Sequence, residues 1–570
     1  MKKLVSLIVL CGVFAQIAPA QAVDKKQARW VEQTVRSLTL REKIGQMINV
    51  RVSGEFANFS SDKFGEFKRE VAENKVGGFT VYRGEANAIA SVTNELQTLS
   101  RVPLFFAADY ERGLRMQLRT GTPFTTNMGV AAAGDVSAAY RQGKIICQEM
   151  RAIGVNWLFA PVVDINNNPD NPVINIRSYG ADPQKVGEFG SALVKGVREA
   201  NCLATLKHFP GHGDTATDSH IGLSVVPIDR QRLDTVELVP FKMAIAAGVD
   251  SIMTAHVALP NITGDQIPST LNPKIETAIL RNELKFDGII STDSMEMGAI
   301  KKTFSDERSA VMAVLAGADV VLLPNSSRVA IDSIEAAVKS GEITEARINE
   351  SVRRLLKAKY RLGLANNRLV DLAKVNQLIE RPENVIEGNA TAERSITLLR
   401  NDNNLLPLKS EAAGKTMFAV IAADDDPVEG IAFIPEIQRR LPNARIVRLD
   451  PRSTKSDYTQ FLADAGSFDN IVLAVFVKRA ANKGTVKLPD LQTEFVRQAI
   501  GSGKRVAAIA FGSPYLIRQF PDVRSYAVTY AIEEIGQYAA VKTLFGEVRY
   551  QGKLPVSIPG LFEIGSGIVK

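Results

Sequence analysis

The chain has 570 residues, of which 45% are hydrophobic and 23% charged, and its formal net charge is +7. This composition is typical of a globular protein, and the length is too great for one hydrophobic core, so we expect two or three domains. The positive charges are spread along the chain without a basic block, which gives no indication of a nucleic-acid partner.

The segment 1–22 has the order of a secretory signal peptide. It begins with Met-Lys-Lys, continues with an apolar run over 4–17 and ends in Ala-Gln-Ala. We therefore predict cleavage before Val23 and export to the periplasm or the extracellular space. A membrane anchor is disfavoured because the run is shorter than the ~20 residues that a spanning helix needs. A lipoprotein through Cys11 is disfavoured by the bulky Leu10 before it.

Two cysteines, Cys147 and Cys202, remain after the predicted cleavage. Two cysteines do not make a disulfide scaffold, although an oxidising compartment would permit one bridge. We expect two separate buried thiols. No Cys-x-x-Cys pair or other metal-type cysteine spacing is present.

Residues 40–330 alternate short β-rich apolar runs with longer segments of helical periodicity, which is the pattern of repeated βα units around a parallel sheet. The candidate strands are Ile44–Val52, Val76–Tyr82, Pro103–Ala108, Val155–Val163, Leu203–Phe209, Ser251–Val257, Gly288–Thr292 and Asp319–Leu323. Eight such units predict a TIM-type (β/α)8 barrel, distorted where the spacing is uneven. We assign residues 23–375 to this catalytic barrel domain.

A second α/β pattern follows the barrel. A helix predicted over 344–360 leads to a linker at 376–415, which contains the polar stretch Arg381–Asn404. Residues 416–570 then form a smaller open-sheet α/β domain, an αβα sandwich. Its candidate strands are Met417–Ala422, Ala444–Leu449, Ile471–Val477, Val506–Phe511 and Tyr526–Tyr530.

Polar side chains lie at the ends of several predicted barrel strands, where a hydrophobic pattern gives no reason for them. They are Asp109 and Glu111 after the third strand, Asp164 after the fourth, Lys207 and His208 on the fifth, His256 on the sixth and Asp293 on the seventh. Because the C-terminal ends of barrel strands converge on one mouth, we expect these residues to share a pocket.

Three of the four histidines lie in one segment, KHFPGHGDTATDSH, from Lys207 to His220. Its glycines and proline predict a mobile loop over the barrel mouth. Three interpretations remain open at this point: a metal site, a structural loop, or a proton shuttle in which Asp218 orients and charges His220. The spacing matches none of the usual short metal motifs, and we expect neither a metal nor another cofactor.

This segment resembles the signature of glycoside hydrolase family 3, in its NagZ-like β-N-acetylglucosaminidase branch. That branch uses an aspartate–histidine pair as acid/base in place of the second carboxylate of most glycosidases. The resemblance implies that Asp218 and His220 form this pair and that Asp293, in FDGIISTDSMEMGA, is the nucleophile. Glu296, three residues later, is the competing carboxylate.

The resemblance also implies sugar-binding residues. AADYERG and NIRSYG place Asp109 and Arg177 at sugar contacts, and Lys207 with His208 match the pair that holds hydroxyls in the −1 subsite. A further binding arginine has two candidates, which are Arg115 and Arg119. His212 and Asp214 are assigned to loop structure. The stretches ERSITLLRNDNNLLPL and LPVSIPG resemble the start and the close of the family's second domain.

The implied activity is that of a retaining exo-β-N-acetylglucosaminidase (β-N-acetylhexosaminidase) acting on peptidoglycan fragments or chitooligosaccharides through a covalent glycosyl-enzyme. The partner is then a carbohydrate, with no integral membrane segment after signal removal and an unknown oligomeric state. Three alternatives stay open. They are a β-glucosidase or β-xylosidase with an acid/base glutamate from the second domain, an N-acetylglucosaminide phosphorylase, and a non-catalytic glycan-binding protein.

Overall fold

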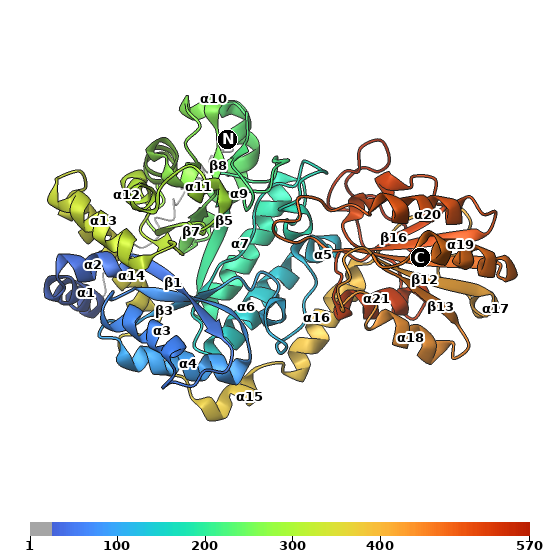
Figure 1. Ribbon diagram of the computed structural model, residues 1–570, viewed down its shortest axis with the longest axis horizontal. Helices are drawn as coiled ribbons and strands as arrows, with labels where there is room; N and C mark the ends of the chain where they lie inside the picture. The colour runs from blue at the N-terminus through green and yellow to red at the C-terminus, as the bar shows by residue number, and fades with distance from the viewer. Residues whose placement is uncertain (1–24) are drawn as a thin grey trace, which may run out of the picture.

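The computed structural model describes residues 25–570 as two α/β domains, the barrel in blue to yellow and the second domain in orange and red (Figure 1). The predicted signal peptide, 1–22, lies outside the described residues. Within residues 25–570, no helix has the length and apolar character needed to cross a membrane.

The first domain is a parallel eight-stranded barrel. Its strands are β1 (Ile48–Gly54), β2 (Gly78–Gly84), β3 (Phe105–Ala108), β4 (Trp157–Leu158), β5 (Leu203–Phe209), β7 (Ser251–Thr254), β9 (Ile289–Thr292) and β10 (Val321–Leu322). Every pairing between neighbours is parallel, and a bridge between Ser291 and Val320 closes the ring. The predicted TIM-type barrel is therefore confirmed.

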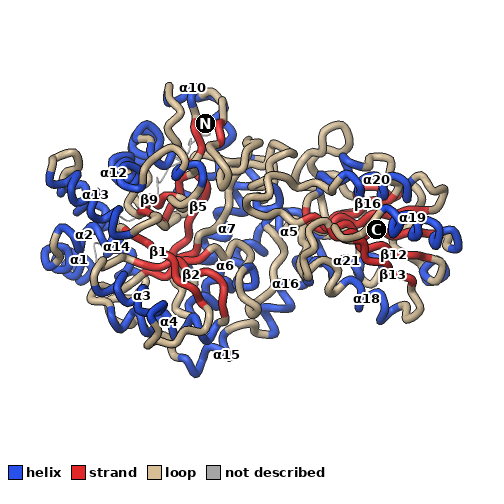
Figure 2. Tube along the Cα trace, viewed as in Figure 1, coloured by secondary structure: helices blue, strands red, loops and turns tan. Residues whose placement is uncertain are grey.

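Helices surround the barrel strands (Figure 2), which explains why the strands read as continuous apolar runs. The outer helices are α3 (Asp62–Ala72), α4 (Ala86–Leu99), α6 (Val136–Ala152), α7 (Pro183–Glu199), α9 (Leu238–Ala246), the π-helix η5 (Lys274–Glu283), α12 (Asp306–Ala316), α13 (Ser327–Lys339) and α14 (Glu345–Arg361). In α14 the residues Ile348, Val352, Leu355 and Leu356 are buried, as helical periodicity predicts.

The fourth strand is shorter than the predicted Val155–Val163. Regular pairing with β5 ends at Leu158, because Pro161 has no N–H to donate to a neighbouring strand. Pairing resumes at one bridge between Val162 and Lys207. This irregular stretch leads directly to Asp164 at the barrel mouth.

The second domain is a six-stranded sheet with helices on both faces. The strands are β11 (Thr397–Asn401), β12 (Thr416–Ala422), β13 (Arg445–Leu449), β14 (Asn470–Val477), β15 (Arg505–Gly512) and β16 (Ser525–Val528), in the spatial order β11-β16-β15-β14-β12-β13. Along β12, Met417, Ala419 and Ile421 join one core and Phe418 and Val420 join the other. This alternation confirms the αβα sandwich.

The helices of the second domain divide between these two cores. The first core contains residues of α19 (Lys455–Asp464) and α20 (Asp490–Ile500). The second contains residues of α16 (Pro382–Ser395), α17 (Ser410–Ala413), α18 (Phe433–Arg440) and α21 (Glu534–Leu544).

The expected linker over 376–415 needs correction, because this segment contains the helix α16 and the edge strand β11. β11 pairs antiparallel with β16, so the second sheet begins before residue 416. The buried face of α16 consists of small or polar residues, namely Asn384, Gly388, Thr391, Ala392 and Ser395. A hydrophobic pattern does not reveal such a face, and this is why the segment read as a linker.

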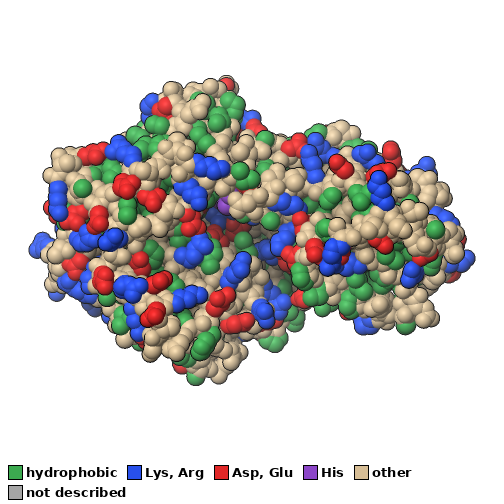
Figure 3. Space-filling view, in the orientation of Figure 1, with side chains coloured by type: hydrophobic (Ala, Val, Ile, Leu, Met, Phe, Trp, Pro, Cys, Tyr) green, Lys and Arg blue, Asp and Glu red, His purple; other side chains and the backbone are tan. Residues whose placement is uncertain are grey.

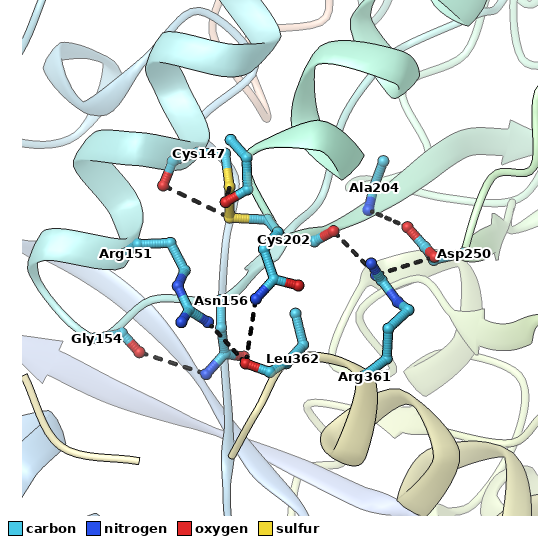
Figure 4. The surroundings of a disulfide bond; sticks show 11 residues. Cys147, Arg151, Gly154, Asn156, Cys202, Ala204, Asp250, Arg361 and Leu362 are labelled. Carbon is cyan, nitrogen blue, oxygen red and sulfur yellow. Dashed lines mark hydrogen bonds and ion pairs between the residues drawn. A yellow bond between two sulfur atoms is a disulfide. The ribbon is translucent and has the colours of Figure 1, made fainter. Parts of the chain in front are cut away.

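The expectation of two separate thiols is wrong, because Cys147 and Cys202 form a disulfide (Figure 4). Cys147 lies on α6 and Cys202 immediately precedes β5, 55 residues later. The packing of α6 beside the start of β5 joins them, which their sequence separation does not indicate. The bridge lies at the N-terminal end of β5, opposite the barrel mouth.

We expect the double change Cys147→Ser/Cys202→Ser to lower the free energy of unfolding by about 2–5 kcal/mol, because it removes a covalent restraint on the unfolded chain. Urea unfolding of the oxidised protein measures this. Wild type unfolded with a reductant is the control and should resemble the variant. Since the bridge is remote from the mouth, kcat should not change, and a large fall in kcat of the folded variant would contradict this placement.

Candidate active site

A pocket of about 260 Å3 opens at the C-terminal ends of the barrel strands. Figure 3 shows a hollow near the middle of the molecule with acidic, basic and histidine side chains at its wall. The polar side chains that line the pocket are Arg51, Tyr82, Asp109, Glu111, Arg177, Lys207, His208, His212, Ser219, His220, Asp293, Ser294, Glu296 and Arg479. The structure thus brings together side chains from distant parts of the sequence, one of them from the second domain.

Six of the site residues predicted from the sequence line this pocket: Asp109, Arg177, Lys207, His208, His220 and Asp293. The seventh, Asp218, contacts the ring of His220.

Asp293 directly follows β9. Its Oδ1 accepts a hydrogen bond from the Ser294 N–H at 2.7 Å. Burial by itself raises the pKa of this carboxyl, but the imidazoles of His256 and His208 and the Ser294 N–H outweigh burial and lower the pKa to about 2. Asp293 is therefore ionised at neutral pH, as a carboxylate nucleophile must be.

Asp218 and His220 form a hydrogen-bonded pair on the loop after β5. Oδ1 of Asp218 accepts the backbone N–H of His220 at 2.9 Å and lies 2.8 Å from its ring Nδ1. Burial alone raises the pKa of Asp218, but these bonds lower it to about 2. An ionised carboxylate can only accept, so Nδ1 carries the hydrogen. The Nε2 atom is left for proton exchange in the pocket.

The backbone around this loop explains how the pair is held at the mouth. The Gly298 N–H donates to the His220 carbonyl at 3.2 Å. A Cβ at position 298 would lie 2.7 Å from that oxygen, so the close approach requires glycine. Further along, β6 (Ser224–Val225) pairs with β8 (Val257–Ala258) and ties the end of the loop to the barrel.

A buried network of charges forms the opposite part of the wall. Lys207 Nζ lies 2.6 Å from Asp109 Oδ1 and 2.8 Å from Glu111 Oε1. Arg177 donates two hydrogen bonds to Glu111, at 3.0 and 2.7 Å. Burial raises the pKa of Glu111, but Arg177 and Lys207 outweigh it and hold the pKa well below its usual range. The network fixes rigid charged groups that can bind sugar hydroxyls.

Asp164 accepts hydrogen bonds from His208 and His212, the first two histidines of the segment. Its Oδ2 accepts from His208 Nδ1 at 2.7 Å, and its Oδ1 accepts the His212 N–H at 2.7 Å. Arg177 Nη2 lies 3.4 Å from His208 Nε2. Asp164 and Arg177 therefore contact the two ring nitrogens of His208 from opposite ends.

His212 and Asp214 take part in loop contacts. The His212 ring lies 2.8 Å from Thr215 Oγ1 through Nδ1 and 2.9 Å from Ser219 Oγ through Nε2. Burial lowers the pKa of His212 to about 4, so the ring is neutral at pH 7. Asp214 lies 3.6 Å from the Arg232 guanidinium. Across the described chain, no group of three or more His, Cys, Asp or Glu side chains is arranged to hold a metal ion.

Of the strand-end residues to which the sequence gives no role, Glu111 lines the pocket, whereas Asp164 and His256 lie behind its wall, where they contact His208 and the Ser294 carbonyl. Arg51 on β1 and Tyr82 on β2 also line the pocket, and no motif in the sequence indicates them. The Arg51 guanidinium lies 4.5 Å from the centre of the Tyr82 ring.

Arg51 also forms an ion pair with Glu296, the competing carboxylate, whose side chain is 42% exposed. A carboxylate that is exposed and paired with arginine is a weaker nucleophile candidate than the buried Asp293.

The structure also places the two candidates for a further sugar-binding arginine, Arg115 and Arg119. Arg115 donates to Gly121 O at 2.8 Å and pairs with Glu380 at 2.7 Å. Arg119 lines an adjoining cavity, so neither arginine is part of the catalytic pocket.

The low pKa of Asp218 predicts how stability depends on pH. Its pKa falls from 3.8 to about 2 on folding, so its ionised form contributes about 2 kcal/mol of stability. This contribution is fully present above pH 4 and is lost as the pH falls towards 2. Comparing the unfolding free energies of wild type and Asp218→Asn between pH 7 and pH 2.5 measures it. We expect the difference to narrow below pH 4, and a constant difference would contradict the low pKa.

A (β/α)8 barrel whose pocket is lined by Asp293 and by a histidine hydrogen-bonded to Asp218, followed by an αβα sandwich, has the architecture of a two-domain glycoside hydrolase. The chain belongs to glycoside hydrolase family 3. Residues 39–358 match the model of the glycosyl hydrolase family 3 N terminal domain, and residues 396–563 match that of the C-terminal domain.

Known proteins similar to this chain include curated relatives and solved structures. Beta-hexosaminidase A of Pseudoalteromonas piscicida is 32% identical over 381 residues, which span 61% of this chain and 63% of that relative. A beta-N-acetylglucosaminidase/beta-glucosidase of Cellulomonas fimi is 25% identical over 94% of this chain and 96% of its own.

Two solved structures have a similar two-domain fold. The family 3 beta-N-acetylglucosaminidase of Paenibacillus sp. superimposes with a TM-score of 0.81 at 32% identity, covering 91% of this chain and 99% of that one. The beta-glucoside phosphorylase BglX superimposes with a TM-score of 0.85 at 25% identity, covering 94% and 97%.

Proposed function

We propose that this protein is a retaining exo-β-N-acetylglucosaminidase that removes terminal β-linked N-acetylhexosamine. The observation that carries the proposal is the Asp218–His220 pair, whose histidine lines the same pocket as the ionised Asp293. Most retaining glycosidases use two carboxylates for these tasks, one as nucleophile and one as acid/base. Here a histidine with a charged orienting partner takes the acid/base task.

The reaction has two steps. In the first, the Asp293 carboxylate attacks the anomeric carbon while His220 Nε2 gives its proton to the glycosidic oxygen. The bond to the leaving group breaks and a covalent glycosyl-enzyme forms. In the second, His220 takes a proton from water, which attacks the anomeric carbon and releases Asp293. Two inversions at that carbon retain its configuration.

The charged network holds the terminal sugar for this attack. Lys207 and Asp109 form one hydroxyl-binding pair, and Arg177 with His208 forms another beside it. These groups are rigid because each already has a buried partner. Binding energy from the sugar hydroxyls then orients the anomeric carbon towards Asp293.

The second domain's contribution to the pocket favours this proposal over a β-glucosidase with an acid/base glutamate from that domain. Among the described residues, the second domain supplies Arg479 to the catalytic pocket. Its Glu533 lines an adjoining cavity and pairs with Arg112 at 2.6 Å. The names of the Pseudoalteromonas and Paenibacillus proteins support an N-acetylhexosaminide substrate as well.

Phosphorolysis is the second candidate. Lys207, Arg177 and Arg479 are cations that line the pocket, and phosphate could replace water as the attacking group in the second step. The similarity to a beta-glucoside phosphorylase supports this alternative.

The test compares 4-nitrophenyl β-N-acetylglucosaminide with the β-glucoside, and follows the products of chitobiose by NMR with and without phosphate. We expect preference for the N-acetylated substrate and β-configured N-acetylglucosamine as the first product. A preference for the glucoside would overturn the substrate assignment. Sugar 1-phosphate as the main product would establish phosphorolysis, and binding without turnover would indicate a glycan-binding protein.

We also propose that the protein is exported and acts on peptidoglycan fragments, with chitooligosaccharides as the alternative. The segment 1–22 supports export, and the Cys147–Cys202 disulfide agrees with an oxidising compartment. N-terminal sequencing of the protein from cell fractions tests this. A mature form that begins at Val23 outside the cytoplasm is expected, and an uncleaved cytoplasmic form would contradict it.

A further inference from the structure

One loop of the second domain reaches the barrel mouth. It connects β14 to α20 and includes residues 478–484. The backbone N–H of Asn482 donates to Asp218 Oδ2 at 2.9 Å. Arg479 Nη1 donates to the Val173 carbonyl at 2.9 Å, and its side chain lines the catalytic pocket. Two residues of the second domain therefore contact the barrel at its catalytic pair and beside its sugar-binding wall.

One hydrogen bond and two ion pairs hold the loop against its own domain. The Lys478 N–H donates to Asp424 Oδ2 at 2.8 Å, and the Lys478 ammonium lies 2.5 Å from Asp426. Lys483, next to Asn482, pairs with Asp424. The contacts on both sides of Asn482 hold its N–H in a defined place relative to the second domain.

The two carboxylate oxygens of Asp218 accept hydrogen bonds from different domains. Oδ1 accepts both hydrogen bonds from His220, and Oδ2 accepts the one from Asn482. The Asp218 side chain is only 1% exposed, so its charge depends on these donors and not on water. A donor on Oδ2 fixes the plane of the carboxylate, and through Oδ1 it fixes the direction of the His220 ring.

The conformation of Asn482 fits this task. Its φ is 64°, in the left-handed region that asparagine and glycine enter with the least strain. The contact with Asp218 is made by the backbone N–H of Asn482.

The same loop also contacts the turn that carries a predicted sugar-binding residue. The Val173 carbonyl accepts from Arg479 Nη1 at 2.9 Å and from Arg177 Nη1 at 3.2 Å. One oxygen thus joins an arginine of the second domain to an arginine of the barrel.

We propose that the 478–484 loop is a positioning element of the acid/base pair, so that the catalytic pair is complete only when the second domain is docked on the barrel. Asn482 acts through Asp218 and is a positioning residue. The inference rests on the proposed role of His220.

The test is Asn482→Pro, which removes the N–H and cannot adopt a positive φ. Asn482→Gly is the matched control, because glycine keeps both. Activity is measured on methyl β-N-acetylglucosaminide, whose leaving group needs a proton, and on the 2,4-dinitrophenyl glycoside, whose leaving group does not. We expect Asn482→Pro to lose about tenfold or more in kcat on the first substrate and less than about twofold in the glycosylation rate on the second. Asn482→Gly should stay within about twofold of wild type on both.

Equal losses on the two substrates would overturn the proposal, because a general loss of folded enzyme lowers both rates alike. Lys483→Met is the second variant, since it removes the brace to Asp424 and leaves the backbone donor intact. We expect Lys483→Met to lose activity selectively on the methyl glycoside, as Asn482→Pro does. If Asn482→Pro fails to fold, equal losses of Lys483→Met on the two substrates would overturn the proposal. His220→Ala separates the two hypotheses. If it shows selective loss and the loop variants do not, the loop proposal fails alone. If it shows none, the role of His220 fails.

Discussion

Replacing Asp293 by asparagine is expected to lower kcat on 4-nitrophenyl β-N-acetylglucosaminide by roughly 10⁴-fold or more. The amide is nearly isosteric, so the fold and the Ser294 contact are kept, but it has no charge with which to attack the anomeric carbon. The surroundings of Asp293 are built to keep it ionised, since its pKa is held at about 2 despite burial. Steady-state kinetics of the purified variant, with circular dichroism to verify folding, measures the effect.

The matched control is Glu296→Gln, which changes the competing carboxylate in the same pocket. Glu296 is exposed and paired with Arg51, so we expect at most about a tenfold effect on kcat/KM from changed contacts at the rim. A fluorinated substrate analogue that traps the glycosyl-enzyme should label the peptide that contains Asp293. Label on the Glu296 carboxylate, or near-normal turnover by Asp293→Asn, would show that the nucleophile is assigned wrongly.

His220→Ala is expected to lower kcat by about 10²–10⁴-fold on substrates with poor leaving groups, which is the usual contribution of a general acid. The glycosylation step on the 2,4-dinitrophenyl glycoside should be nearly unaffected, because that leaving group departs without a proton. Pre-steady-state kinetics should show a burst of dinitrophenol followed by slow turnover, since the variant lacks a base to activate water. Azide should accelerate the second step, because it attacks without needing a base.

His212→Ala is the matched control for this experiment. His212 lies on the same loop, but both of its ring nitrogens contact loop residues, Thr215 and Ser219. Its loss should affect both substrates to the same extent, through the shape of the loop. If His220→Ala behaved like His212→Ala, the histidine would be structural and the acid/base would have to be sought elsewhere.

Much of this site could be predicted without a structure. The eight apolar runs that predict barrel strands correspond to β1, β2, β3, β4, β5, β7, β9 and β10. Polar residues at their ends, such as Asp109, Lys207 and Asp293, line one pocket. The reason is that a strand buried on both faces tolerates a charged residue only where it opens to the mouth. Asp218 and His220 are only two positions apart, so the sequence alone suggests that their side chains meet.

Other features depend on packing between distant segments. The Cys147–Cys202 bridge requires α6 to lie beside the start of β5. The helix α16 read as a linker because its buried face is built from small and polar residues. Arg479 and Asn482 have no motif around them, and only the docking of the second domain brings them to the pocket.

By itself, the sequence determined the parallel barrel, the second sandwich domain and the local chemistry of the segment from Lys207 to His220, since periodicity and short spacing are properties of neighbouring residues. The tertiary structure decided what completes that segment. Closure of the barrel places Asp293, at the end of the seventh strand, in the same pocket as His220. The docking of the second domain places the Asn482 N–H against Asp218. Asp293 is 73 positions from His220 and Asn482 is 264 positions from Asp218, and residues so far apart in sequence meet only once both domains have folded.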